Sequence, residues 1–308
     1  MIKKVALILL ITNFIFWFLQ PNDFVKLGAQ LFNQNRFDEA IGCFLFALEQ
    51  EPKNMSASFF LGRTLMYNNE MRLSKKIWKE FVNLYPGNLQ GWKNLAFVYS
   101  EGFKKYDKAI NIYKEVLKKD PYNVAVHIQL GWWLLLIGKL KEGFEECKWI
   151  EETETNKVAN CQIQTWTGIE SLIDKKVILY SNDEIGDTIF YLRYAKLIKD
   201  MGTKKISLMT RSTFMKHLFQ SCPYIDFICD LDDTISEVDY KIRLGNLPIL
   251  FKTDAHSIPS NTPYIYSDHA LIKFWKNKLN LDKNIKVGLC WQGGDEHDTY
   301  EDTRRKNY

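Results

Sequence analysis

A short stretch around Gly186 and Asp187 holds the residue types best suited to chemistry in this 308-residue chain. It runs Ser181-Asn-Asp-Glu-Ile-Gly-Asp-Thr-Ile-Phe-Tyr-Leu-Arg-Tyr194 and follows an apolar run, 176–180, that predicts a buried strand. A glycine at the start of a helix lets a ligand approach the backbone, and the helix amino terminus favours an anion. The Asp187 carboxylate could accept a proton from a substrate hydroxyl. Aspartate is also a common helix cap, so a purely structural role for Asp187 stays open.

Other side chains that could do chemistry lack the spacing for it. The six cysteines form no C-x-x-C pair, and most lie in apolar stretches, as buried thiols do in a reducing compartment. The histidines have no paired nucleophile at a recognisable spacing, and the sequence contains no P-loop. The acidic run 295–302 is more typical of a solvated tail than of a metal site. We therefore expect no metal site and no covalently bound cofactor.

The composition excludes some partners and sets the number of folding units. Hydrophobic residues make up 46% of the chain and aromatic residues 14%, which is enough apolar surface for folded cores. The net charge is only +4, and Lys and Arg are scattered among Asp and Glu, so no basic stripe for nucleic acid is present. The length of 308 residues favours two folding units.

Strand and helix patterns alternate after a polar linker at 151–160. Strand patterns occupy 205–209, 227–229, 240–243, 264–266 and 286–290. Helical patterns occupy 187–201, 212–220 and 269–280. This alternation predicts an α/β domain with a mainly parallel, doubly wound sheet, in which ligands bind beyond the carboxyl ends of the strands. The stretch around Asp187 lies where such a sheet would hold a ligand.

The first half of the chain repeats with a period of 34 residues. A leucine followed by a small residue recurs at Leu27-Gly28, Leu61-Gly62, Leu95-Ala96 and Leu130-Gly131. Prolines keep nearly the same step, at Pro52, Pro86 and Pro121. A fixed period of this length is typical of a stack of small helical units, each closed by a residue that cannot continue a helix.

This pattern resembles the tetratricopeptide repeat, a helix-turn-helix unit with an aromatic residue, Leu-Gly, a large residue, then Ala, an aromatic residue and Pro. The first repeat matches at Phe24, Leu27, Gly28, Leu31, Ala40, Phe44, Ala47 and Pro52. The third repeat has one extra residue near Gly102, and the fourth lacks a closing proline. The resemblance implies an α solenoid of about four repeats over 21–152, with its aromatic residues in the core and a concave face that binds a protein or peptide.

The stretch 181–194 resembles the E-Q-G-L-G-D-T-x-x-x-x-R-Y motif of a glycosyltransferase-like domain that follows tetratricopeptide repeats in many bacterial proteins. That domain is itself similar to lipopolysaccharide heptosyltransferases. Further matches occur in order at Trp166-Thr-Gly168, Leu247-Pro248, Ile258-Pro259, Pro263-Tyr264, Trp275 and Val287-Gly-Leu-Cys-Trp-Gln-Gly293. The resemblance implies that Asp187 is the base toward an acceptor sugar, with a substrate-binding role for Gly186, Thr188, Arg193 and Gly293.

Enzymes of this type consist of two Rossmann domains in the arrangement called GT-B, and the second domain holds the nucleotide-sugar donor. Because the sequence ends at Tyr308, the resemblance implies an incomplete, acceptor-side Rossmann half over 162–308, with a nucleotide-sugar donor only if a second domain is present. Two functions stay open: a repeat scaffold fused to this half of a transferase, and a non-catalytic adaptor with a degenerate module. Asn182 and Glu184 replace the first Glu and first Gly of the motif, which favours the adaptor.

The amino-terminal segment 1–20 is a separate unit. Lys3 and Lys4 precede a run at 5–19 that is apolar except for Thr12 and Asn13. Such a segment could be an uncleaved membrane anchor, a helix that caps the solenoid, or a signal peptide, although no small-residue cleavage site follows it. We expect a cytoplasmic protein, with membrane association through 5–19 as the open alternative.

Overall fold

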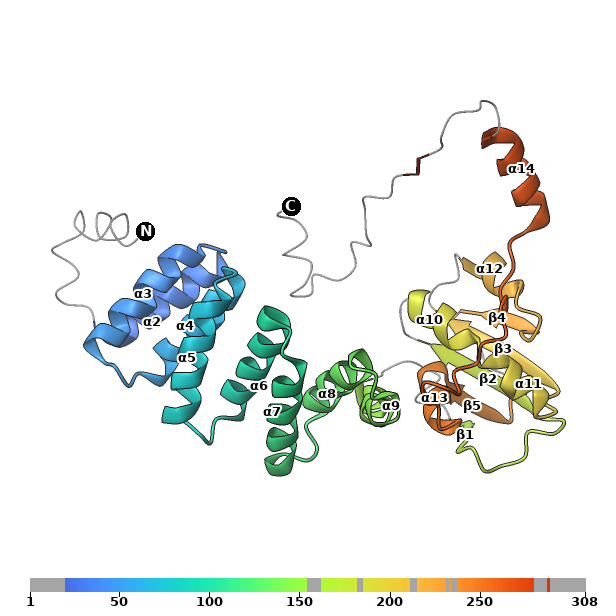
Figure 1. Cartoon of the computed structure of the whole chain (residues 1–308), viewed down its shortest axis with the longest axis horizontal. Coiled ribbons are helices and arrows are strands. Elements are labelled where there is room, and N and C mark those ends of the chain that lie inside the picture. Colours follow the sequence, from blue (N-terminus) through green and yellow to red (C-terminus); the bar gives the residue numbers. More distant parts are fainter. Residues whose placement is uncertain are drawn as a thin grey trace.

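The computed structural model describes residues 20–153, 162–181, 185–210, 215–230, 233, 237–279 and 287–288. It consists of a helical part followed by a part built on a sheet (Figure 1). The predicted linker lies largely outside the described residues, as do 1–19, Gly293 and most of the strand expected at 286–290.

The helical part is a series of helix pairs. The pairs are α2 (Pro21–Asn33) with α3 (Phe37–Gln50), α4 (Met55–Tyr67) with α5 (Met71–Leu84), α6 (Leu89–Phe97) with α7 (Tyr106–Lys119), and α8 (Val124–Leu136) with α9 (Leu140–Cys147). Each helix packs on its partner, and the second helix of each pair packs on the first helix of the next (Figure 1). The prediction of a tetratricopeptide-type helical repeat is therefore confirmed.

The first two pairs are each held together through a glycine that faces a ring. A Cβ added to Gly28 would lie 2.6 Å from the ring of Phe44, and one added to Gly62 would lie 2.7 Å from the ring of Trp78. Both rings are completely buried. Because real side chains do not approach this closely, the glycine is what allows the two helices to come together around the ring.

An asparagine caps the first helix of each of the last three repeats. The side chains of Asn54, Asn88 and Asn123 accept hydrogen bonds from the backbone N–H groups of Ala57, Gly91 and Val126. These bonds satisfy donors that the helix itself leaves without a partner. The proline two residues before each asparagine ends the previous repeat. The end of one repeat and the start of the next helix are therefore marked by the same pair of residues at each boundary.

The extra residue of the third repeat is taken up inside its first helix. After α6 the chain continues as a π-helical turn, η2 (Val98–Gly102), in which Val98 and Ser100 are buried. A π turn holds one residue more than an α turn, so the insertion leaves the packing on both sides unchanged. Leu95 and Leu130 are both buried although their step is 35 rather than 34 residues.

The fourth repeat closes without proline. A 3-10 helix, η3 (Lys148–Thr153), follows α9. The ring of His127 in α8 stacks on Trp149 at 4.2 Å, its Nδ1 lies 2.5 Å from Glu146 Oε2, and its Nε2 donates to the Pro121 carbonyl at 2.8 Å. One histidine thus joins both helices of the last repeat to the turn before it.

The second part is a five-stranded parallel sheet. Its strands are β1 (Gln164–Thr165), β2 (Lys176–Ser181), β3 (Lys205–Thr210), β4 (Phe227–Cys229) and β5 (Tyr240–Arg243), in the spatial order β1-β5-β2-β3-β4. All the strand pairs are parallel. The mainly parallel sheet expected from the sequence is therefore present, with the short β1 as an additional edge strand.

Helical turns connect the strands. They are α10 (Ile185–Leu192), α11 (Ala195–Asp200), α12 (Lys216–Gln220), η5 (Leu244–Asn246), α13 (Leu247–Leu250) and α14 (His269–Leu279). The prediction of one helix over 187–201 was wrong, because a turn at Arg193 and Tyr194 divides it. Tyr194 is fully buried at that turn and donates to Thr253 Oγ1 at 2.9 Å, a tertiary contact that fixes the break.

The strand predicted at 264–266 was also wrong. The Tyr264 hydroxyl donates to the Ile189 carbonyl, and the Tyr266 N–H donates to Ser221 Oγ. The segment therefore crosses the helices that cover the sheet instead of pairing with a strand.

The main core of this part lies on one face of the sheet. It joins strand residues such as Leu179 and Leu208 to residues of α10, α11, α12 and α13. The smaller cluster on the opposite face, around Ile178 and Met209, contains no helical residue. Helices on both faces, as a doubly wound sheet requires, are thus not what the described residues show. Helix α14 stands apart from the sheet and contains no buried residue (Figure 1).

Candidate functional site

The strand order reverses beside β2, and this places the candidate site. From β2 the chain moves outward through β3 to β4, and then returns to add β5 on the other side of β2. The segments that leave β2 and β5 therefore diverge, and Tyr180 and Arg243 are register partners at this edge. Open parallel sheets bind ligands in the crevice formed at such a reversal.

Gly186 and Asp187 lie at this edge, in the first turn of α10, and both are exposed. No described atom comes within 4 Å of a Cβ added to Gly186. The helix amino terminus attracts negative charge, so the position suits an ionised carboxylate and a bound anion equally.

Thr188 faces inward instead. It is completely buried, and its Oγ1 donates to Ser181 Oγ at 3.2 Å. This bond ties the first turn of α10 to the end of β2. Of the predicted substrate-binding residues, Thr188 thus positions the turn that carries Asp187.

Arg193 lies at the opposite end of α10. It follows Asp187 by six positions, which is about 9 Å along a helix axis. Its Nε donates to the Phe190 carbonyl at 2.9 Å, its Nη2 donates to the Tyr264 hydroxyl at 3.4 Å, and the guanidinium packs on both rings. The structure therefore brings Gly186, Asp187 and Thr188 together and places Arg193 apart from them.

Two buried cations at the same sheet edge were missed by sequence reasoning. Lys241 and Arg243 on β5 are 6% and 3% exposed. The Arg243 guanidinium lies where a side chain on Gly245 would be, since a Cβ there would meet its Nη1. Burying charge is costly and usually reflects a specific role. The alternation Tyr240-Lys-Ile-Arg243, with cations on one face of a strand, is the signal that could have identified them.

The end of the solenoid adjoins this edge. The Asn246 side chain donates to Glu151 Oε1 at 2.6 Å, and α13 contacts α9. Burial raises the pKa of the Cys147 thiol to about 12, and the charge of Arg243 acts in the opposite direction. The last repeat and the carboxyl end of β5 therefore form one continuous region.

Thiol chemistry has no support in the described residues. Burial raises the pKa of Cys43 and of Cys229 to about 11, so both thiols are protonated at neutral pH. Within the same residues no group of three or more His, Cys, Asp or Glu side chains could hold a metal ion. No helix that the structure describes is long and apolar enough to cross a membrane.

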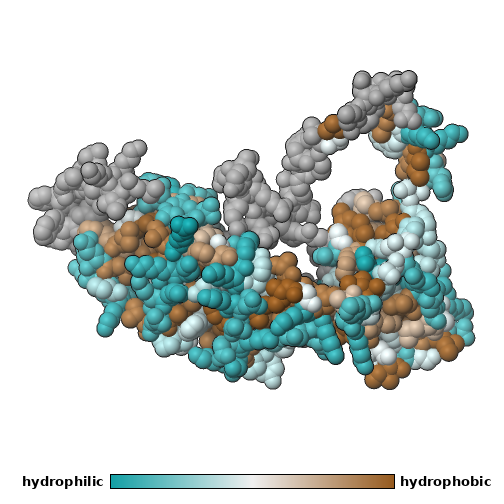
Figure 2. Space-filling model, viewed as in Figure 1, coloured by the Kyte–Doolittle hydropathy of each residue, from teal (hydrophilic) through white to brown (hydrophobic). Residues whose placement is uncertain are grey.

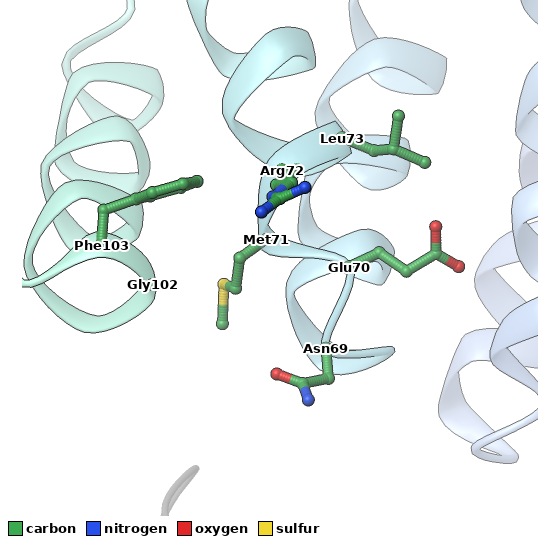
Figure 3. Close-up of a pocket in the computed structure, with 7 residues that line it drawn as sticks. All are labelled: Asn69, Glu70, Met71, Arg72, Leu73, Gly102 and Phe103. Carbon is green, nitrogen blue, oxygen red and sulfur yellow. The ribbon is translucent and has the colours of Figure 1, made fainter.

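The solenoid carries a surface hollow and exposed apolar side chains. The hollow lies between the turns of the second and third repeats and is lined by Asn69, Glu70, Met71, Arg72, Leu73, Gly102 and Phe103 (Figure 3). Trp132 and Leu136 on α8 are 50% and 58% exposed, and residues four apart share one side of a helix. Hydrophobic side chains reach the surface on both parts of the protein (Figure 2). The solenoid therefore offers apolar surface to a partner.

Solved structures that are similar to this chain include helical repeat proteins of the TPR type. One similar structure is MamA, residues 41 to the end, from Desulfovibrio magneticus RS-1, with 21% identity and a TM-score of 0.40 over 43% of this chain and 75% of that one. Another is a thermophilic TPR protein from Thermus thermophilus, with 23% identity and a TM-score of 0.37 over 43% and 75%. No protein-family model and no curated protein matches the sequence. The helix pairs themselves identify the first half as a tetratricopeptide-type repeat, an architecture typical of protein-interaction scaffolds.

Proposed function

We propose that the protein is a scaffold whose solenoid binds a protein or peptide, and whose sheet-based part is the acceptor-side half of a nucleotide-sugar-dependent glycosyltransferase. The observation that carries the second part of this proposal is the position of Asp187. It stands exposed at the amino terminus of α10, beyond the strand where the sheet order reverses.

The strand order supports a Rossmann-like half. Without the short β1, the strands taken in sequence run 3-2-1-4 across the sheet, as in one side of a dinucleotide-binding fold. In such a site the Asp187 carboxylate takes the proton of the acceptor hydroxyl, whose oxygen attacks the anomeric carbon while the bond to the nucleotide diphosphate breaks. Gly186 leaves space for the acceptor beside the backbone.

A donor domain would be a separate body. Helix α14 supports this part of the proposal, because its apolar residues Leu271, Phe274 and Trp275 are all about half exposed. A helix with such a face usually buries it against another element. A second domain that holds the nucleotide sugar would supply that element.

The test is sugar transfer from a panel of nucleotide sugars to an oligosaccharide library, with the full chain and any longer natural form. Asp187→Asn should reduce transfer by about a hundredfold or more, since a positioned base contributes that much. Asp174→Asn is the matched control, because Asp174 is an exposed aspartate of the same part in a turn that asparagine also tolerates. If neither form transfers a sugar, the enzymatic part of the proposal is wrong.

The scaffold part has its own test, selection of peptides from a displayed library by the full chain. Trp132→Ala with Leu136→Ala should weaken binding of a selected peptide about tenfold or more, because exposed aromatic and leucine side chains would be its contacts. Leu84→Ala, which removes an equally exposed leucine from α5, should leave the affinity unchanged.

A non-catalytic adaptor is the second candidate function. It is favoured by the packing of Arg193. The motif implies a substrate-binding role for this residue, but here its guanidinium donates to the Tyr264 hydroxyl, which in turn donates to the Ile189 carbonyl of α10. An adaptor would keep its partner affinity in Asp187→Asn and would show no transfer with any donor.

A further inference from the structure

The hollow on the solenoid lies where the third repeat departs from the others (Figure 3). It is bounded on one side by the first turn of α5 and on the other by the end of η2, the π-helical turn that takes up the extra residue. A Cβ added to Gly102 would lie 3.0 Å from Met71, so the glycine lets η2 come close to α5. Because π-helical turns are frequent at functional sites, this boundary is a candidate binding site.

The backbone just after η2 also differs from the other repeats. The turn between the two helices of a repeat contains a residue in the left-handed region, which is Asn35, Asn69 and Gly138 in the first, second and fourth repeats. In the third repeat it is Lys104, with a φ of 52°. Asparagine and glycine adopt this conformation more readily than lysine does. The turn beside the hollow thus holds a conformation that its own sequence does not favour, as backbone at binding sites often does.

The charge around the hollow is mainly positive. The stretches 70–76 and 101–108 contain six Lys and Arg residues and three Asp and Glu residues. The first turns of α3, α7 and α9 contain acidic residues, whereas that of α5 contains none and carries Arg72. Glu70, the acidic residue that lines the hollow, accepts a hydrogen bond from Asn68 Nδ2 and extends away from Phe103 (Figure 3). The hollow is therefore complementary to a negatively charged ligand.

Arg72 and Lys75 are cations that such a ligand could use. Arg72 is exposed, and within the part of the chain that the structure describes neither residue forms an ion pair with a carboxylate. The Lys75 Nζ lies 3.6 Å from the centroid of the Phe103 ring, and Phe103 and Met71 are only partly buried. Apolar surface and unpaired positive charge thus lie side by side. A ligand that carries an apolar group next to a negative charge would match both.

We propose that this hollow binds an acidic peptide segment, with an apolar side chain of the segment on Met71 and Phe103 and its carboxylates on Arg72 and Lys75. The inference rests on the proposed scaffold function and names the chemistry of one partner. A small anion would leave Met71 and Phe103 without a contact, and the scattered charges of the chain give a nucleic acid no continuous track. A carboxylate that meets arginine forms a charge-assisted hydrogen bond, which is stronger than a bond between neutral groups.

The test uses the full chain and an array of short synthetic peptides in which aspartate or glutamate flanks one apolar residue. A second array carries asparagine and glutamine in place of the acids. The chain should bind acidic peptides and not their amide counterparts, and binding should weaken as salt is added, because salt screens exposed charges. Arg72→Ala should weaken the best acidic peptide about tenfold or more, since a hydrogen bond to a charged group contributes that much. Fluorescence anisotropy of the labelled peptide measures the affinity.

Lys79→Ala is the matched control, because Lys79 is an exposed cation about two turns further along α5. It should bind the acidic peptide like the unaltered chain. Phe103→Ala, with its helix content checked by circular dichroism, should lose the preference for an apolar residue between the acids. The inference is overturned if amide peptides bind as tightly as acidic ones, or if Arg72→Ala and Lys79→Ala weaken binding equally.

The double variant Trp132→Ala with Leu136→Ala separates this inference from the scaffold proposal. It should leave the affinity for the acidic peptide unchanged, because both residues lie on α8 and outside the hollow. If this variant loses the acidic peptide while Arg72→Ala keeps it, the scaffold proposal stands and the hollow is not the site. If the chain binds no peptide from the arrays or from the displayed library, the scaffold proposal itself is wrong.

Discussion

Two glycines of the solenoid and one helical glycine of the sheet-based part have different surroundings. In the solenoid, Gly28 and Gly62 face the rings of Phe44 and Trp78 so closely that one methyl group would overlap them. In the sheet-based part, Gly186 also lies in a helix, yet no described atom would touch a methyl group there. The first two glycines are required by packing, and the third is not.

This difference distinguishes glycines that helix packing requires from a glycine whose position could instead be used for ligand binding. Wherever a glycine is explained by a neighbouring ring, its substitution should cost stability. Wherever the space beside it is open, its substitution should leave stability unchanged and affect only what binds there. Variants in both parts can test this distinction, because the two kinds of position should differ in how much unfolding free energy a substitution costs.

The largest effect is expected for Trp78→Ala. The side chain is completely buried between α4 and α5 and touches the rings of Phe59 and Phe81, so its removal should cost about 3–5 kcal/mol of unfolding free energy. Urea unfolding followed by circular dichroism measures it. Tyr122→Ala, at an aromatic residue that is 80% exposed, should cost far less, and an equal loss would contradict the packing role of Trp78.

The solenoid could be predicted from sequence because its contacts are local. Gly28 and Phe44 lie in one helix pair, so a single repeat contains both partners of the contact, and the next repeat shows it again at Gly62 and Trp78. The asparagine caps at Asn54, Asn88 and Asn123 were missed, although they recur at the same step and could have been identified in the same way.

The sheet-based part was less predictable because its determinants are distant in sequence. The break between α10 and α11 is fixed by the bond from Tyr194 to Thr253, 59 residues away. The burial of Arg243 depends on where β5 enters the sheet, which no local pattern reveals. At the site, the sequence identified Gly186 and Asp187 at the start of a helix, but not the separation of Arg193 from them.

A smaller effect is expected for Asn54→Ala. The substitution removes the acceptor of the Ala57 N–H and should lower the unfolding free energy by about 1 kcal/mol. Asn33→Ala is the matched control, because Asn33 is an exposed asparagine near the end of α2 and caps no helix start. Equal losses in the two variants, measured in urea, would show that capping does not stabilise the repeat.

The smallest effect on stability is expected for Gly186→Ala. Because no described atom lies within 4 Å of a Cβ added to Gly186, the unfolding free energy should change by no more than about 0.5 kcal/mol. Binding of an acceptor sugar, once one is identified by the transfer assay, should weaken by about tenfold if the acceptor approaches this backbone. Calorimetric titration measures the second quantity, and an unchanged affinity would place the acceptor elsewhere.

The most direct test of the packing account is the unfolding free energy of Gly62→Ala, measured alone and together with Trp78→Ala. Alone, the added methyl group meets the indole ring and should cost about 1–3 kcal/mol. With the ring removed, the same methyl group should cost nothing or stabilise the helix, since alanine favours helices over glycine. An equal cost in both backgrounds would show that the ring is not the reason for the glycine, and would contradict the account.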